Sequence, residues 1–212
     1  MDKNIVYINH TIILKILLYP TRMFYIAATR FNNSTYEENI SYRKKRETPV
    51  IYGTNIRIRN IYPIGALLFV VEMNNELNKI MGIGLIRNQQ VISEKLIRIY
   101  SNNDYNRYIY GGNYWLSREI IATIDPEIVN IFDLILFKGK SHLKRISGIS
   151  ILTDKLMTNW RYDLPGIKYR VKRIFTTYFE KDIDIDIDIY ENIMPTENNM
   201  DGVNVSIETE SL

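Results

Sequence analysis

The sequence predicts an α+β fold in which helices flank a mixed, barrel-like β-sheet. Its central feature is an apolar run at residues 66–73, which a polar turn joins to a second apolar run at residues 80–86. This pattern is typical of a buried β-hairpin. Gly82 and Gly84 lie two apart, so one face of the second strand lacks side chains and another segment or a ligand can approach it. The alternative is that the two glycines only relieve crowding where a barrel strand bends. The third observation is a proline-capped helix start at Asp125.

Length and charge predict one domain with two short extensions. A chain of 212 residues with 46% hydrophobic content can build a single core. We expect an N-terminal extension at residues 1–22, the domain at 23–179 and an acidic, disordered tail at 180–212. Residues 1–179 hold 26 Lys and Arg against 14 Asp and Glu, whereas the tail holds 1 against 10. A basic body with an acidic tail favours a polyanionic partner, and a merely soluble charged surface is the alternative.

The composition excludes several classes of chemistry. Cysteine is absent and histidine occurs twice, so disulfides, thiolate zinc sites and cysteine nucleophiles are excluded and a histidine metal site is disfavoured. The phosphate-binding G-x-x-x-x-G-K motif and the G-x-S-x-G nucleophile motif are missing. Ser141 and His142 are sequence neighbours, whose side chains point apart on a strand. We therefore expect a protein that is not an enzyme and that uses no metal or other cofactor.

The N-terminal apolar stretch does not read as a membrane anchor. Residues 5–19 are interrupted by Asn9, His10 and Lys15, and they fall short of the ~20 apolar residues of a membrane span. A small-residue cleavage site is also lacking, which disfavours a secretory signal. The sequence therefore predicts a soluble, intracellular protein without membrane contact.

Before the hairpin we expect one strand and two loops. Residues 24–31 read as the strand. A polar loop follows and ends in four adjacent cations, which repel one another and must be solvated or neutralised: Arg43, Lys44, Lys45 and Arg46. Residues 51–60 combine an aromatic ring, a glycine, an amide and two arginines, as in loops that hold a flat polar ring. Here Tyr52 is the candidate for stacking and Asn55 for reading a base edge.

Aromatic residues are concentrated after the hairpin, within residues 103–121. Tyr108 and Tyr110 share a face of an extended segment, and residues 114–121, with Trp115, read as a further strand. Aromatic rings beside arginine favour base stacking, whereas packing across neighbouring strands is the alternative.

The second half of the domain is predicted to hold helices and one basic loop. Asp125 caps a helix that runs to Lys138 and stops at Gly139. Cations on the following loop suit phosphate contacts, and a solvated basic turn is the alternative. The candidate phosphate ligands are Lys138, Lys140, His142, Lys144 and Arg145. Two more helices, at residues 153–160 and 165–179, are expected to close the domain.

The order of these segments resembles that of the EVE and YTH branch of the PUA-like superfamily. The segments that carry the resemblance are FYIAATRF, YGTNIRIRN, GALLFVVEMNNELNKIMGIGLI, NYWLSREI and KGKSHLKRISGISILTDKL. They cover roughly residues 23–160, and MGIGLI matches the glycine, apolar residue, glycine pattern of the hairpin in that branch. The chain is also similar to uncharacterised proteins of large nucleocytoplasmic DNA viruses, through E-M-N-N, I-M-G-I-G-L-I-R-N and K-G-x-x-H-L-K-R.

The resemblance implies a PUA-like barrel that binds RNA or DNA and holds a modified or flipped base in an aromatic cage. The positions that would form the cage are Tyr52 with Tyr108, Tyr110 or Trp115, and tyrosine stands where the YTH branch has tryptophan. The alternative is a non-catalytic viral structural or interaction protein, in the infected cell or the virion, that keeps the fold without the pocket. An open aromatic cavity beside Gly82 and Gly84 would favour base binding, and a filled one the alternative.

Overall fold

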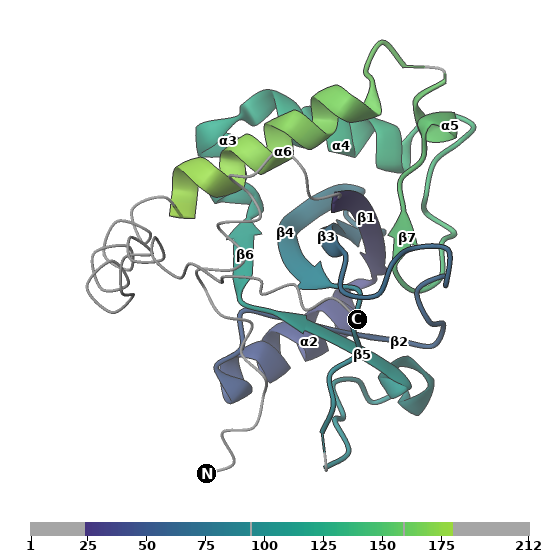
Figure 1. Cartoon of the computed structure of the whole chain (residues 1–212), viewed down its shortest axis with the longest axis vertical. Coiled ribbons are helices and arrows are strands. Elements are labelled where there is room, and N and C mark those ends of the chain that lie inside the picture. The colour runs from purple at the N-terminus through teal and green to yellow at the C-terminus, as the bar shows by residue number, and fades with distance from the viewer. Residues whose placement is uncertain (1–23, 94, 159, 180–212) are drawn as a thin grey trace, which may run out of the picture.

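A curved five-stranded sheet forms the centre of the computed structural model, which describes residues 24–93, 95–158 and 160–179 (Figure 1). The predicted extension at 1–22 and the predicted acidic tail lie outside these residues. In spatial order the strands are β6 (Tyr114–Ser117), β4 (Lys79–Arg87), β3 (Leu67–Asn74), β1 (Phe24–Phe31) and β7 (Ser150–Ile151). The sheet is mixed, because β1 runs parallel to β3 whereas β3 and β4 are antiparallel. The α+β class is therefore confirmed.

The strands do not close into the predicted barrel. Among the described residues, β2 (Val50–Thr54) and β5 (Tyr108–Gly112) pair with each other in a separate two-stranded sheet. This sheet crosses the open side of the curved one (Figure 1). Gly112 lies against the backbone of β4, where an added Cβ would be 2.0 Å from the carbonyl oxygen of Leu85. The two sheets thus pack closely without a continuous ladder of hydrogen bonds.

The central hairpin is confirmed. Every residue of β3 is buried, which explains its continuous apolar run, because a strand covered on both faces shows no alternation. On one face, α3 (Arg118–Ile124), α4 (Pro126–Phe137) and α6 (Leu164–Phe179) cover the sheet (Figure 1). On the other face lie β2 and β5, with the helix α2 (Asn33–Arg46) beside them (Figure 1). The core therefore has two parts, one on each side of β1, β3 and β4.

Helix α2 occupies a stretch that the sequence predicts to be a polar loop. Its N-cap is Asn32, whose side chain accepts a hydrogen bond from the Thr35 N–H while the Thr35 hydroxyl accepts one from the Asn32 N–H. This reciprocal arrangement is a capping box with threonine in the place usual for Glu or Gln. The last turn carries the four cations of residues 43–46, which the negative end of the helix dipole favours. The prediction of a loop is therefore wrong. The helix was not predicted because its sequence shows almost no apolar periodicity.

Other elements differ from the predictions at their boundaries. The residue range 51–60 begins as strand β2 and becomes a loop after Thr54. The strand predicted for residues 114–121 ends at Ser117, whose hydroxyl accepts from the Ile120 N–H and caps α3. Helix α4 begins at Pro126, as predicted, and ends at Phe137, one residue before the predicted end at Lys138. The described residues also form two short elements, the 3-10 helix η1 (Asn103–Asn106) and the helix α5 (Asp154–Met157).

Candidate functional site

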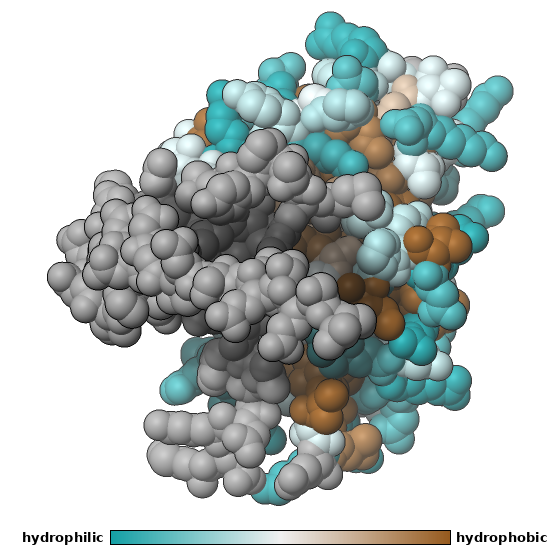
Figure 2. Space-filling model, viewed as in Figure 1, coloured by the Kyte–Doolittle hydropathy of each residue, from teal (hydrophilic) through white to brown (hydrophobic). Residues whose placement is uncertain are grey.

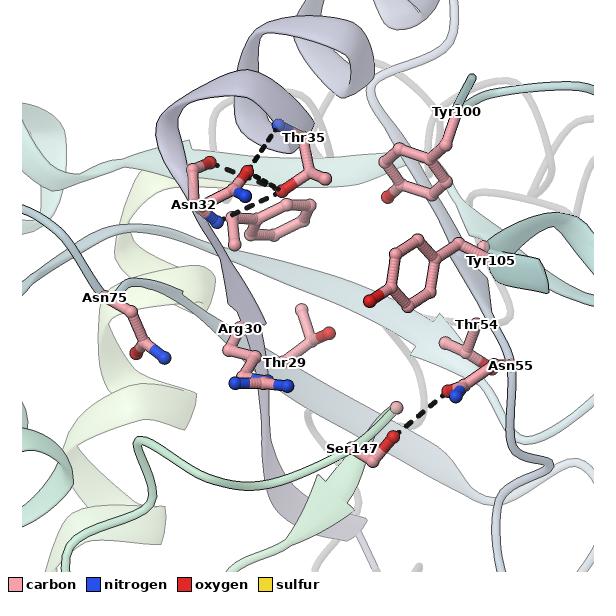
Figure 3. Close-up of a pocket in the computed structure, with 13 residues that line it drawn as sticks. Thr29, Arg30, Asn32, Thr35, Thr54, Asn55, Asn75, Tyr100, Tyr105 and Ser147 are labelled. Atoms are coloured by element: carbon pink, nitrogen blue, oxygen red, sulfur yellow. Dashed lines mark hydrogen bonds between the residues drawn. The ribbon is translucent and has the colours of Figure 1, made fainter. Parts of the chain in front are cut away.

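An open pocket of about 250 Å³ lies where the ends of β1 and β2 meet the start of α2 (Figure 3). Its walls are mostly polar, with asparagine, threonine and serine side chains beside two tyrosines. Arg30 is the one charged residue among the described residues that line it. The pocket is therefore positively charged and rich in hydrogen-bonding groups, without a carboxylate to repel an anion.

The basic loop predicted to hold phosphates is tied to the rim of this pocket by three hydrogen bonds. The backbone carbonyl of Lys144 accepts from Arg30 Nη1 at 3.3 Å and from Asn75 Nδ2 at 2.7 Å. Further along the loop, the Ser147 hydroxyl and Asn55 Oδ1 lie 3.1 Å apart (Figure 3). Lys144 Nζ also donates to Asn78 Oδ1 at 2.6 Å. The loop is thus anchored to the ends of β1, β2 and β3.

Two tyrosines form the aromatic wall of the pocket. Tyr100 is buried, and its hydroxyl accepts from Asn39 Nδ2 at 3.0 Å. Burial raises the pKa of Tyr100, so it stays a neutral phenol. Tyr105 is half-buried, packs edge-on against Tyr100 with ring centroids 6.1 Å apart, and points its hydroxyl into the pocket (Figure 3). Tyr105 is therefore the ring that a ligand can reach.

Three polar groups at the pocket have hydrogen-bonding capacity left over. Arg30 is exposed and makes no ion pair among the described residues. Asn55 bonds Ser147 through its oxygen, which leaves its amide N–H groups for a ligand. The side-chain oxygen of Asn75 is buried and has no partner in the described structure. A ligand with hydrogen-bond acceptors can therefore bond to the Arg30 guanidinium and the Asn55 amide.

The space beside Gly82 and Gly84 is filled. A Cβ at Gly84 would stand 2.3 Å from the Tyr52 hydroxyl, and one at Gly82 would stand 2.9 Å from the Trp115 ring. The Arg43 guanidinium lies over both rings, at 5.4 Å from the centre of Tyr52 and 5.6 Å from that of Trp115. The chain itself thus occupies the position in which the sequence predicts an aromatic cage.

This filling places Tyr52 in a buried polar cluster. Arg43 Nη2 donates to Glu72 Oε1 at 2.5 Å, and the Tyr52 hydroxyl donates to the same oxygen at 2.7 Å. Burial, reinforced by the Glu72 carboxylate, raises the pKa of Tyr52, so the phenol remains a donor. Burial alone would lower the pKa of Arg43, and Glu72 outweighs this and raises it. Tyr52 is 1% exposed, so its predicted stacking on a base is wrong for this structure.

The other predicted aromatic residues lie away from the pocket. Tyr110 is 1% exposed, and its hydroxyl accepts from the Ile58 N–H at 3.2 Å. Trp115 packs over Gly82, and Tyr108 is half-buried on β5. Of the predicted base-reading residues, Asn55 therefore lines the pocket, whereas the aromatic ones pack in the core cluster on the β2 and β5 side of the sheet.

The predicted phosphate ligands do not all lie at the pocket. Lys144 and Arg145 belong to the loop that is anchored at the pocket, and Arg145 is exposed. Lys138 and Lys140 are exposed at the end of α4, and the structure records no contact between either residue and the pocket. His142 is half-buried, and its Nδ1 accepts a long hydrogen bond of 3.4 Å from the Lys144 N–H.

Sequence reasoning missed Arg30, Asn75 and Tyr105. Arg30 is the penultimate residue of an apolar strand and Asn75 lies in the hairpin turn, so neither carries a local signal of a binding site. Tyr105 lies within the aromatic segment 103–121, but the alternation expected of a strand favoured Tyr108 and Tyr110 as the stacking residues.

Comparisons with protein-family models, curated proteins and solved structures gave no match. No helix within residues 24–93, 95–158 and 160–179 is long and apolar enough to cross a membrane. The same residues contain no group of three His, Asp or Glu side chains arranged to hold a metal ion. The described residues thus define an α+β protein with a mixed sheet and a polar pocket in which Arg30 supplies a positive charge.

Proposed function

We propose that this chain is a nucleic-acid-binding module of the PUA-like type. In this proposal the polar pocket that Arg30 lines, which we call the Arg30 pocket, takes one base, and the adjacent basic loop contacts phosphates. A single observation carries the proposal: the same hollow brings together Asn55, the accessible ring of Tyr105 and the loop of Lys144 and Arg145. These groups come from distant parts of the sequence, and they supply stacking, edge recognition and positive charge.

The size and chemistry of the pocket support a single flat ring. Its volume of about 250 Å³ is below the usual range of sites for drug-sized ligands, about 300–1,000 Å³, so a base fits better than an extended ligand. Tyr105 offers a ring for stacking, and the Asn55 amide offers donors to acceptors on a base edge. Arg30 adds a planar donor that suits a carbonyl or phosphate oxygen.

The electrostatics support a polyanion at the rim of the pocket. Residues 1–179 carry an excess of 12 positive charges, and the loop next to the pocket contributes Lys144 and Arg145. Phosphate contacts of this kind position a nucleic acid without reading its sequence. Tyr105 thus takes the stacking role that the sequence gives to Tyr52.

A second candidate function is a non-catalytic structural or interaction protein of viral type. The filled space beside Gly82 and Gly84 favours it, because the predicted aromatic cage is occupied by Arg43. This candidate requires no affinity of the Arg30 pocket for nucleic acid.

The test compares two tyrosines that differ in position. Tyr105→Ala should weaken binding of short single-stranded oligonucleotides by about 1–3 kcal/mol in fluorescence anisotropy, as loss of stacking on one base does. Tyr169 lies on α6 and is 67% exposed, outside the pocket, and Tyr169→Ala should leave affinity unchanged. Equal affinities for both variants and the unchanged protein would favour the structural candidate.

A further inference from the structure

A second hollow, of about 340 Å³, lies between the β2–β3 connection and the segment after β4. Its apolar wall, which we call the isoleucine groove, consists of Ile58, Tyr62, Pro63, Ile64 and Ile92. Ile64 is 77% exposed and Ile92 is 80% exposed. On the face that Figure 2 views, apolar residues lie at the surface among predominantly hydrophilic ones.

Most of the large exposed hydrophobic residues of the described structure lie in the two chain segments that contribute to this groove, and Ile64 and Ile92 line it. Of the eight large ones, five lie in the segments 55–66 and 88–98: Ile56, Ile61, Ile64, Ile92 and Leu96. Single exposed apolar residues are normal on any surface, but Ile64 and Ile92 line the same hollow together with Ile58, Tyr62 and Pro63. Such a wall is typical of a surface that another apolar segment covers.

The chain enters the described structure directly beside this groove. Phe24 pairs with Leu67, which follows the groove residues along the chain. The Tyr25 ring packs edge-on against Tyr62, with centroids 5.1 Å apart. Tyr62 is itself part of the groove. The residues that precede β1 therefore start within two positions of a side chain that touches the groove wall.

The segment before β1 has the composition of an apolar partner. Eleven of the fifteen residues at positions 5–19 are Ile, Leu, Val or Tyr. Tyr19 lies six positions before Tyr25, a span of at most about 22 Å in an extended chain. The apolar stretch can thus reach the groove, and burying it there would remove both apolar surfaces from water.

We propose that residues 5–19 dock on the isoleucine groove of the same chain. The asparagine and glutamine side chains that share the hollow, Asn60, Gln89 and Gln90, offer hydrogen bonds to the backbone of the docked segment. Other occupants of the groove would be a second copy of the chain or a separate apolar partner.

A double-mutant cycle in the full-length chain tests the docking. Ile64→Asp and Leu17→Asp should each lower the melting temperature by at least about 3 °C, because each places a charge in a buried apolar contact. The melting temperature of the double variant should be no lower than that of the more affected single variant, since both changes break the same contact. Ile92→Asp provides a second groove variant with the same expectation.

The control pairs Leu17→Asp with Leu77→Asp, because Leu77 is 48% exposed in the β3–β4 turn and does not line the groove. These two changes should act independently. Unaltered melting temperatures in both groove variants, or full additivity with Leu17→Asp, would overturn the proposal. Sedimentation of the unchanged protein should show a monomer, and a dimer that Ile64→Asp dissociates would instead assign the groove to a second copy.

Discussion

Arg43 and Glu72 form an ion pair inside the protein, with Arg43 Nη2 2.5 Å from Glu72 Oε1 and side chains that are 6% and 0% exposed. The pair joins the last turn of α2 to the second half of β3. Glu72 also accepts from the Tyr52 hydroxyl, so one carboxylate organises the space beside Gly82 and Gly84.

Removing the charge of Glu72 should destabilise the fold strongly. Glu72→Gln leaves the Arg43 guanidinium buried without a counter-charge, and we expect the free energy of unfolding to fall by about 3–5 kcal/mol. Urea denaturation at neutral pH measures the change. The double variant Arg43→Met with Glu72→Gln should recover much of the loss, because no uncompensated charge remains.

An exposed ion pair provides the matched control for Glu72. Asp104 and Arg107 lie 2.6 Å apart, with side chains 61% and 62% exposed. Asp104→Asn should change the free energy of unfolding by no more than about 0.5 kcal/mol, since water screens such a pair. A Glu72→Gln variant as mild as Asp104→Asn would contradict the role of the buried pair.

Asp125 should make the fold sensitive to acid. Its carboxylate caps α4 through the Ile128 N–H at 3.2 Å and accepts from Arg170 Nε at 2.9 Å. Burial would raise the pKa of Asp125, but the hydrogen bonds from Arg170 and Ile128 outweigh it and lower the pKa. Because the pKa of Asp125 is lowered in the folded state, the carboxylate stabilises the fold above its ordinary pKa of about 4. This contribution is lost as the pH falls through the lowered pKa.

Thermal unfolding between pH 7 and pH 2 measures this effect. Asp125→Asn keeps a capping side chain and removes the charge, so it should lower stability at pH 7 and flatten the loss in acid. Asp125→Ala removes the cap as well and should cost about 1 kcal/mol more at every pH. An acid profile that is the same for Asp125→Asn and the unchanged protein would refute the assignment.

Gly84 should tolerate no side chain while Tyr52 keeps its hydroxyl. Gly84→Ala places a Cβ 2.3 Å from that oxygen and 3.0 Å from Val50, so we expect a loss of about 1–3 kcal/mol in the free energy of unfolding. In a Tyr52→Phe background the same change should cost less. At Gly111 the nearest atom would lie at 3.3 Å, so Gly111→Ala should be milder. An equal loss of unfolding free energy in Gly84→Ala and Gly111→Ala would show that the close approach of Tyr52 to Gly84 does not set the cost.

The acidic tail should compete with nucleic acid for the basic body. Deleting residues 180–212 removes 10 acidic residues and one lysine, and we expect tighter oligonucleotide binding at low salt. The difference should fade as salt screens the charges. Affinity that is unchanged at low salt would count against competition.

The sequence was sufficient where local signals set the structure. The β3–β4 hairpin shows a continuous apolar run around a polar turn, and α4 combines an N-cap aspartate with a proline at its first position. Helix α2 was not predictable in the same way. Its stability depends on a threonine capping box and on the contact of Arg43 with Glu72, which lies 29 residues further on.

The candidate site was predictable only in part, because the pocket is assembled from segments that are distant in the sequence. Asn55 and the basic loop were found from their residue types, and the structure brings them together through Ser147. Tyr52 was misplaced because its environment depends on Glu72, whose position across the sheet no local pattern reveals. Arg30 becomes part of the site only through the fold of β1 against the Lys144 loop.

A salt series of fluorescence anisotropy with short single- and double-stranded oligonucleotides tests the central claim most directly. We expect the unchanged protein to bind at least one of them more tightly than about 0.1 mM, the weak end of ordinary non-specific binding. Neutralising Lys144 and Arg145 should lower affinity for all sequences and flatten the salt dependence by roughly one unit of slope per lost phosphate contact. If every oligonucleotide binds with a dissociation constant above about 0.1 mM at low salt, the result contradicts a nucleic-acid-binding function and favours the structural candidate.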